Sequence, residues 1–483
     1  MSGIFGVASK HDCVRDLFYG TDYHSHLGTE FGGMAVLGKK FTRQIHNISQ
    51  TQFKSKFYED SRLMSCTKGI GVISAHDEQP IYINSRFGPF CIVTNGFIEN
   101  AEKLAAGLMD RGVSFSEVTK GSVNITELIA KLIVEGSSIV SGIEKMFEMI
   151  EGSCSLLLLN KDGIYAARDR YGYTSMVLGK RKDAWAVTSE TSAFPNNGFE
   201  IASDLGPGEI VLINEDGPQV KKVQGVRSQI CTFFWIYTGF PASTYEGVNT
   251  EIVRERSGRF LAKRDKDIGV DLVAGVPDSG VGHAIGYAME SGKPYRRPLV
   301  KYTPGYGRSY TPPSQETRDL IATMKLIPVK EIIDSQRIVL CEDSIVRGTQ
   351  LKNFAIKKLW SAGAKEIHVR PACPPLMFPC RFNLSTRTIN ELVARRAIRS
   401  IEGRDVADVA AYIDHKSPKY RKMVDWIAKY IGVTTLRYQT VDDMVKAIGL
   451  PREKLCLYCW TGECCGKSSC RKKSKESETV LKS

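Results

Sequence analysis

Helical and strand patterns alternate from about residue 250 onwards, and this alternation restricts the possible folds of the chain more than any other feature. Strands that are separated by helices form a parallel sheet with crossover helices. We therefore expect an α/β domain here. The expected helices cover 252–265, 281–292 and 349–363, and the expected strands cover 270–276, 336–343 and 365–372.

The first 225 residues have a different pattern, with short alternating or β-branched runs separated by turn pairs such as Asn95-Gly96 and Asp162-Gly163. Two helical patterns, over 100–112 and 124–136, interrupt these runs. The pattern predicts stacked, largely antiparallel sheets with helices packed on them. A length of 483 residues also favours two or three domains over one.

The net charge of +13 raises the question of nucleic-acid binding, but the distribution of the charge argues against it. The stretch from Lys467 to Lys482 holds six basic and two acidic residues, which is +4 of the +13, in a polar tail that we expect to be disordered. Some of the remaining positive charge can serve an anionic substrate.

The sequence also predicts the compartment of the protein. It has no run of about 18 apolar residues and no signal sequence at its start, so we expect a cytoplasmic protein without a membrane span. Thirteen cysteines are then not expected to form structural disulfides. Cys13, Cys91 and Cys154 lie in apolar runs that predict core positions.

The strongest local signal is "IVLCEDSIVRGTQL", in which an apolar strand runs into Glu342 and Asp343. Ser344, Gly348 and Thr349 follow in a loop at the expected start of a helix. Main-chain amides at such a junction bind phosphate, while the carboxylates can face hydroxyl groups or a cation.

A second loop strengthens this interpretation. "GVPDSG" follows the earlier strand and also presents small residues at a strand end. An ordinary β–α turn with solvated acidic residues is the alternative for either loop alone. Two such loops together indicate a polyphosphorylated ligand.

"CEDSIVRGT" resembles the phosphoribosyl-pyrophosphate loop of type I phosphoribosyltransferases, and "DSIVRGT" is typical of the glutamine phosphoribosylpyrophosphate amidotransferase family. The resemblance implies that Glu342 and Asp343 bind the ribose hydroxyls and Mg²⁺. It implies that the loop after them binds the 5′-phosphate, through Ser344, Arg347, Gly348 and Thr349, and that Asp278 and Ser279 contact pyrophosphate.

"VKYTPGYGRSYTPPSQETRD" resembles the mobile loop of that family, which closes over the substrate and excludes water. Lys301 and Arg308 match its two basic positions, with one extra residue between them. Ribosyl transfer passes through a cation-like centre, so shielding from water and stabilisation of pyrophosphate matter more than a strong base.

The C-terminal cysteines resemble ligands of the iron–sulfur branch of the family. "ICTFFWIY", "CPPLMFPC" and "CLYCWTG" match its three ligand segments, which implies that Cys231, Cys380, Cys456 and Cys459 hold a [4Fe-4S] cluster. A structural zinc site is one alternative. Cys464, Cys465 and Cys470 could replace a ligand, and ordinary thiols near a tail are the other alternative.

The first half resembles the N-terminal glutaminase domain of the family in "TNGFIENA", "ARDRYGY", "SETSAF" and "LGPGEIVLIN". The resemblance implies an N-terminal-nucleophile αββα sandwich followed by a type I phosphoribosyltransferase domain. It places a nucleophile at Ser2, once Met1 is removed, and an oxyanion hole at Asn95 and Gly96. We expect domains over 1–230 and 231–465 and a tail over 466–483.

The glutaminase site departs from the family pattern. Ser2 replaces a catalytic cysteine and is the poorer nucleophile. The family has an arginine that binds the glutamine carboxylate at the position where this chain reads "VISAH". Ile73 or its neighbours cannot form that ion pair. Ile125 stands at the acidic position that receives the glutamine amino group, and "YTGFPAS" replaces the "ARPDS" segment between the domains.

These observations predict an amidophosphoribosyltransferase that forms 5-phosphoribosylamine and pyrophosphate for purine biosynthesis, with ammonia rather than glutamine as donor. A transferase for another amine is one alternative. A sensor that binds phosphoribosyl pyrophosphate or nucleotides without turnover is the other. The resemblance also implies a homodimer or homotetramer.

Overall fold

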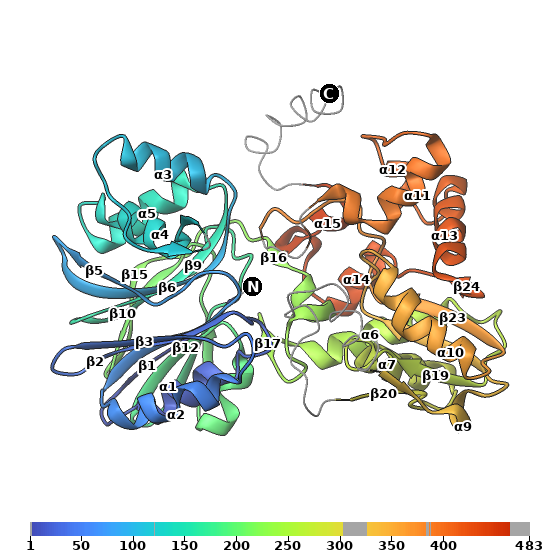
Figure 1. Ribbon diagram of the computed structural model, residues 1–483, viewed down its shortest axis with the longest axis horizontal. Coiled ribbons are helices and arrows are strands. Elements are labelled where there is room, and N and C mark those ends of the chain that lie inside the picture. Colours follow the sequence, from blue (N-terminus) through green and yellow to red (C-terminus); the bar gives the residue numbers. More distant parts are fainter. Residues whose placement is uncertain (1, 120, 303–325, 383–385, 387, 464–483) are drawn as a thin grey trace.

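The computed structural model describes residues 2–119, 121–302, 326–382, 386 and 388–463. Two lobes lie side by side, the first built from the N-terminal half of the chain and the second from the C-terminal half (Figure 1). Ser153 of the first lobe donates a hydrogen bond to the main-chain oxygen of Phe382 in the second, at 2.8 Å. The ring of Phe382 also stacks on Tyr173, with the ring centres 3.8 Å apart.

The first lobe contains two antiparallel sheets. The seven-stranded sheet has the order β13 (Glu200–Asp204), β11 (Val177–Arg181), β12 (Ala184–Thr188), β1 (Gly3–Ser9), β4 (Lys68–Ser74), β2 (Phe31–Leu37), β3 (Phe41–Asn47). The six-stranded sheet has the order β15 (Gly217–Lys222), β14 (Ile210–Asn214), β10 (Gly163–Ala167), β9 (Gly152–Asn160), β6 (Gly88–Ile98), β5 (Ile81–Ser85).

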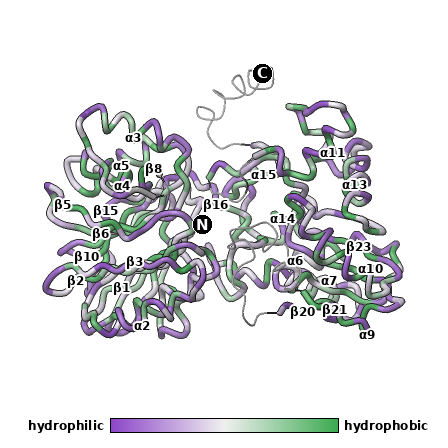
Figure 2. The backbone as a smooth tube through the Cα atoms, in the orientation of Figure 1, coloured by the Kyte–Doolittle hydropathy of each residue, from purple (hydrophilic) through white to green (hydrophobic). Residues whose placement is uncertain are grey.

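Each sheet has one face on the other sheet and one face under helices, as the pattern of the first 225 residues predicts. Ile4, Val72 and Leu157 belong to a core between the sheets. A second core lies under α1 (Val14–Asp22) and α2 (Phe53–Leu63), and a third under α3 (Ala101–Met109), α4 (Ile125–Val134) and α5 (Ile139–Met149). The lobe is therefore an αββα sandwich, with apolar segments inside (Figure 2).

The second lobe is built on a four-stranded parallel sheet, which confirms the α/β expectation. Its order is β19 (Leu272–Gly275), β22 (Arg337–Glu342), β23 (Glu366–Pro371), β24 (Thr435–Leu436). Ile338 and Leu340 face one core and Val339 and Cys341 the other, so both faces of the strand are buried. This is why the strand reads as a continuous apolar run.

Helices cover both faces of this sheet. Val339 and Cys341 share a core with α6 (Thr250–Lys263) and α7 (Val281–Ser291), and the other face carries η4 (Leu351–Ile356), α10 (Lys357–Ser361), α11 (Val393–Glu402), α12 (Ala410–Ile413) and α13 (Pro418–Ile431). As expected, α7 ends at Gly292, which has a φ of 68°. The expected helix over 349–363 instead begins with the π-helical turn η4 and continues as α10.

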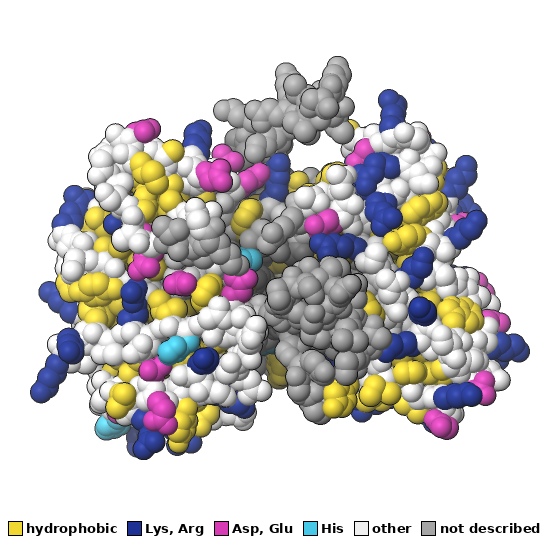
Figure 3. Space-filling view, in the orientation of Figure 1, with side chains coloured by type: hydrophobic (Ala, Val, Ile, Leu, Met, Phe, Trp, Pro, Cys, Tyr) yellow, Lys and Arg dark blue, Asp and Glu magenta, His cyan; other side chains and the backbone are white. Residues whose placement is uncertain are grey.

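Shorter elements join the lobes and complete the second one. They are β16 (Ile230–Cys231), η3 (Phe234–Thr238), β17 (Thr244–Tyr245), β18 (Val248–Asn249), β20 (Leu299–Lys301), β21 (Leu326–Pro328), α9 (Lys330–Ile333), α14 (Val441–Ile448), β25 (Leu455–Cys456) and α15 (Tyr458–Thr461). None of the helices in the described part of the chain combines the length and apolar character that a membrane crossing needs. On the face shown in Figure 3, Lys and Arg side chains lie over both lobes among acidic and apolar ones.

Candidate active sites and the cysteine group

Glu342 and Asp343 lie at the carboxyl end of β22 and are only 8% and 6% exposed. Ser279 Oγ donates a hydrogen bond to Glu342 Oε1 at 2.5 Å, and the main-chain nitrogen of Asp343 donates to the same oxygen at 3.0 Å. Burial raises the pKa of both carboxyls, and the charge of Asp343 raises that of Glu342 further. Two buried neighbouring carboxylates suit a cation or a set of hydroxyl groups.

The two loops predicted to bind phosphate groups are neighbours. β19 pairs with β22 in parallel, with Gly275 opposite Cys341, so the loops at their carboxyl ends adjoin. A Cβ at Gly280 would lie 2.1 Å from the main-chain oxygen of Cys341, so only glycine allows this approach. Lys301 Nζ lies 2.7 Å from Asp278 Oδ2, which brings the predicted cation to this loop.

The loop after the carboxylates contains the other predicted contacts. Ser344 Oγ donates a hydrogen bond to Asp343 Oδ1 at 2.5 Å. Gly348 has a φ of 76°, which favours glycine. Arg347 is exposed and its guanidinium lies 3.0 Å from Glu391, while Thr349 is half-buried at the start of the helical segment. Arg308 falls outside the described residues.

Ser2 lies beside the predicted oxyanion residues of β6. Its main-chain nitrogen donates a hydrogen bond to Asn95 Oδ1 at 3.2 Å, and Asn95 is only 4% exposed. A Cβ at Gly96 would lie 2.0 Å from the main-chain oxygen of Ser153, so this position requires glycine. The arrangement suits a nucleophile whose own amino group is its base.

The two positions expected to have lost a charge are occupied by packed side chains. Ile73 is fully buried in β4, opposite Gly3, and shares a core with Phe5 and Met34. Ile125 is half-buried at the first position of α4 and packs on the core beneath that helix. Neither side chain can pair with the carboxylate or the amino group of an amino acid.

The acidic residue that remains in the "NITE" stretch is engaged elsewhere. Glu127 is fully buried and accepts hydrogen bonds from the main-chain nitrogens of Ser116, at 3.1 Å, and Glu117, at 2.8 Å. Lys131 Nζ lies 3.5 Å from the same carboxylate. Glu127 therefore fixes the loop before α4.

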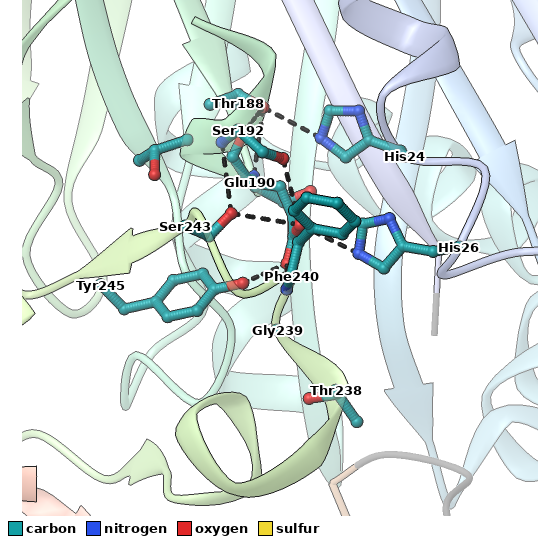
Figure 4. Close-up of polar contacts among 12 residues, drawn as sticks. His24, His26, Thr188, Glu190, Ser192, Thr238, Gly239, Phe240, Ser243 and Tyr245 are labelled. Atoms are coloured by element: carbon teal, nitrogen blue, oxygen red, sulfur yellow. Dashed lines mark hydrogen bonds and ion pairs between the residues drawn. The ribbon is translucent and has the colours of Figure 1, made fainter. Parts of the chain in front are cut away.

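Sequence reasoning missed a polar cluster around Glu190, which is 1% exposed (Figure 4). His26 Nε2 lies 2.9 Å from Glu190 Oε2, Tyr245 donates a hydrogen bond to Oε1, and Ser243 Oγ donates to Oε2 at 3.2 Å. Burial raises the pKa of Glu190, but the charge of His26 and hydrogen bonds from His26 and Tyr245 outweigh it and hold the pKa below its usual value. The available signal was a carboxylate within an otherwise small or apolar stretch, "SETSAF".

His24 lies next to this cluster but is uncharged. Its ring nitrogens bond with the main-chain oxygen of Gly20, at 2.8 Å, and with Thr188 Oγ1, at 2.9 Å. Burial lowers the pKa of His24 to about 4, so this ring is neutral at pH 7.

The four predicted cysteine ligands meet where the chain enters and leaves the second lobe. Cys231 pairs with Cys456 in the parallel β16–β25 bridge. The Cys459 thiol hydrogen-bonds with Cys380, and this bond, burial and then the charges of Cys380, Cys456 and Cys231 raise the pKa of Cys459 well above its usual value. Cys464, Cys465 and Cys470 lie outside the described residues.

Cysteine thiolates are ligands both of zinc and of iron–sulfur clusters. Among the residues that the structure describes, no three His, Cys, Asp or Glu side chains are close enough to bind one metal ion. A zinc site would need four sulfurs about 2.3 Å from one centre. Four neighbouring cysteines are the usual donor set of a [4Fe-4S] cluster.

Comparison with known proteins covers nearly the whole chain. A family model described as "Glutamine amidotransferase domain" matches residues 66–196. The amidophosphoribosyltransferase of Methanocaldococcus jannaschii is 30% identical over 96% of this chain and 97% of its own, and that of Bacillus subtilis is 29% identical over 95% and 93%.

A solved structure agrees with these sequence relatives. The glutamine phosphoribosylpyrophosphate (PRPP) amidotransferase from B. subtilis, complexed with ADP and GMP, superposes with a TM-score of 0.81 at 28% identity. The match covers 95% of this chain and 96% of that one. By sequence and by fold, the chain belongs to the amidophosphoribosyltransferase family.

Proposed function

We propose that the protein transfers ammonia to phosphoribosyl pyrophosphate, in the purine-biosynthesis reaction that forms 5-phosphoribosylamine. The nitrogen of ammonia forms a bond to the anomeric carbon of the ribose as the bond to pyrophosphate breaks, and one proton is released. The observation that carries this proposal is the buried pair Glu342 and Asp343 at the end of β22, beside the loop that contains Ser279.

Each part of the second-lobe site has a role in this proposal. Glu342 and Asp343 bind the ribose hydroxyls and Mg²⁺, which neutralises charge on the pyrophosphate. The loop from Ser344 to Thr349 binds the 5′-phosphate. Asp278, Ser279 and Lys301 bind pyrophosphate together with Arg308, and the Lys301–Asp278 ion pair keeps the lysine next to this loop.

The first lobe supports ammonia rather than glutamine as the donor. A glutamine site needs charged partners for the carboxylate and the amino group of its substrate, and Ile73 and Ile125 supply neither. The hydroxyl of Ser2 is also a weaker nucleophile than a thiolate. Asn95 and Gly96 remain next to Ser2, so the frame of the pocket is kept while its specificity is lost.

A [4Fe-4S] cluster on Cys231, Cys380, Cys456 and Cys459 fits the proposal as a structural group that ties both ends of the second lobe together. Four thiols among apolar neighbours suit such a cluster. Iron and acid-labile sulfide are measured in anaerobically purified protein. The expected result is four irons per chain and their loss in Cys459→Ser, whereas one zinc per chain would contradict the cluster.

The activity test measures pyrophosphate release from phosphoribosyl pyrophosphate and Mg²⁺ with ammonium or with glutamine. Release with ammonium alone is the expected result. Release with glutamine would contradict the loss of the glutaminase. Silence with both donors but binding of phosphoribosyl pyrophosphate would indicate another amine donor or a sensor.

A further inference from the structure

The carboxylate of Glu190 is deeply buried but takes no part in the proposed reaction. Its partners are the nearby Ser192 and two distant parts of the chain, His26 and the segment 240–245. The main-chain nitrogen of Phe240 donates a hydrogen bond to Oε1 at 3.2 Å, in addition to the bonds from Ser243 and Tyr245. Glu190 thus binds the segment that leads from the first lobe into the second.

The same segment is attached to the first lobe at a second place. β17 and β18 form a hairpin whose turn contains Glu246 and Gly247, both with positive φ. The main-chain nitrogen of Glu246 donates a hydrogen bond to Asp204 Oδ1 at 3.2 Å. The carboxylate of Glu246 lies 2.6 Å from the buried guanidinium of Arg168. Glu190 therefore binds Tyr245 of the hairpin, while Asp204 and Arg168 bind the next residue, Glu246.

The hairpin leads directly into α6, which packs closely on α7, the helix that follows the Ser279 loop. Asn249, the last residue of the hairpin, caps α6 by accepting a hydrogen bond from the main-chain nitrogen of Ile252 at 3.2 Å. One turn later Arg254, which is 4% exposed, donates hydrogen bonds to the main-chain oxygens of Trp235, Tyr237 and Gly239 at 2.8–3.1 Å.

Arg254 also contacts the helix that begins at the predicted phosphate-binding loop. The ring nitrogens of His283, in α7, lie 3.2 Å from the main-chain oxygen of Arg254 and 3.2 Å from that of Ile236. α7 starts at Val281, just after Asp278 and Ser279, and Ser279 donates a hydrogen bond to Glu342. A shift of the hairpin and of Arg254 therefore reaches the loop beside the substrate carboxylates.

At its other end the Glu190 segment contacts β1, the strand that follows Ser2. Ser189 Oγ accepts a hydrogen bond from the main-chain nitrogen of Ile4 at 3.0 Å, and the nitrogen of Ser189 donates to the oxygen of Ile4 at 3.1 Å. Hydrogen bonds thus connect β1, the Glu190 segment, the hairpin and Arg254 without interruption.

We propose that Glu190 is a positioning residue for the phosphoribosyl-pyrophosphate site, acting through the β17–β18 hairpin and Arg254. The inference rests on the proposed function, because it concerns the same ligand. Loss of the carboxylate releases Tyr245, Ser243 and the nitrogen of Phe240, so the hairpin and then Arg254 lose their fixed place. By the reciprocity of coupled sites, ligand binding in the second lobe then protects the hairpin.

The test compares wild type with Glu190→Ala, Glu190→Gln and Tyr245→Phe in the full-length protein. Calorimetry gives the Kd of phosphoribosyl pyrophosphate with Mg²⁺, and we expect Glu190→Ala to weaken binding about tenfold and Glu190→Gln, which keeps an oxygen acceptor, about threefold. Glu200→Gln, an exposed carboxylate on β13 of the same lobe, is the matched control and leaves Kd unchanged.

Two further readouts separate positioning from general destabilisation. At saturating phosphoribosyl pyrophosphate, the ammonium-dependent kcat of Glu190→Gln returns to the wild-type value, whereas a partly unfolded enzyme loses kcat at every concentration. Hydrogen exchange of the amides over 240–246 slows on ligand binding in wild type but not in Glu190→Ala.

The outcomes are distinct. An unchanged Kd in both Glu190→Gln and Tyr245→Phe would overturn the inference and leave the proposed function intact. If Glu190→Ala does not fold, these two variants decide the question together with Arg254→Lys, for which we expect weaker binding. A wild-type protein that does not bind phosphoribosyl pyrophosphate would overturn the proposed function and the inference with it.

Discussion

The substrate loops of the second lobe and the Ser2 pocket of the first lobe place polar groups in different surroundings. Burial raises the pKa of Glu342 and of Asp343, so their charged forms are costly unless a cation or hydroxyl groups compensate for the burial. In the first lobe, the buried apolar side chain of Ile73 occupies a position where the binding of glutamine would need a charged side chain. The second lobe thus buries charged groups at its proposed substrate site, whereas the corresponding position of the first lobe is apolar.

Removing the two carboxylates tests the polar side of this comparison and has the largest expected effect. We expect Glu342→Gln/Asp343→Asn to lower ammonium-dependent pyrophosphate release about 100- to 10,000-fold, because two charged hydrogen-bonding groups worth ~1.5–3 kcal/mol each are lost. The melting temperature without ligand should not fall, since two buried like charges disappear. A fall in both activity and melting temperature would mean that the pair has a structural role.

Placing a cation at Ile73 tests the apolar side. The side chain of Ile73 lies between strands and helices of the first lobe, so Ile73→Arg buries an unpaired charge and should lower the free energy of unfolding by about 3–5 kcal/mol. Denaturant unfolding measures this change. Tolerance of the arginine with a loss below about 1 kcal/mol would mean that this position opens to a ligand.

Ile125→Asp is the matched control for that substitution. Ile125 is half-buried at the first position of α4, where a negative charge is favoured by about 0.3–1 kcal/mol. This gain offsets part of the apolar contact that is lost. We therefore expect a change in unfolding free energy within about 1 kcal/mol, far smaller than for Ile73→Arg.

These contrasts explain how much the sequence could predict. The alternation of helices and strands identifies the parallel sheet, and strand ends in a parallel sheet converge, so Glu342 and Ser279 could be brought together from the sequence. The four cysteines came together only through the family resemblance. Glu190 could not be interpreted, because its partners at 26 and 240–245 are related to it by tertiary packing alone.

Asp204 of β13, which binds the β17–β18 hairpin, gives the first lobe a predicted pH dependence. Burial and then the charge of Glu246 raise the pKa of Asp204 from 3.8 to about 6. The folded protein therefore binds this proton more tightly than the unfolded chain does. The free energy of unfolding should fall as pH rises from about 4 to 6, by at most about 3 kcal/mol.

Asp204→Asn should remove this part of the pH dependence, as measured by denaturant unfolding at pH 4, 5, 6 and 7. Asp183 provides a control of opposite sign, because its hydrogen bond to Arg181 lowers its pKa. Its contribution is present above its unfolded pKa and is lost as pH falls. If the unfolding free energy of Asp204→Asn has the same pH profile as wild type, the pKa of Asp204 is not raised in the folded protein.

The smallest expected effect is at Ser2. If the first lobe has lost its glutaminase, Ser2→Ala should leave ammonium-dependent pyrophosphate release within about twofold of wild type, because Ser2 lies beside Asn95 of the first lobe and its hydroxyl takes no part in the proposed transfer. Steady-state rates with ammonium and with glutamine are measured for both proteins, after mass spectrometry has established whether Met1 is present. A glutamine-dependent rate that disappears in Ser2→Ala would show that the serine acts as a nucleophile without the two charged partners. The first lobe would then retain its glutaminase chemistry and have lost only affinity for glutamine.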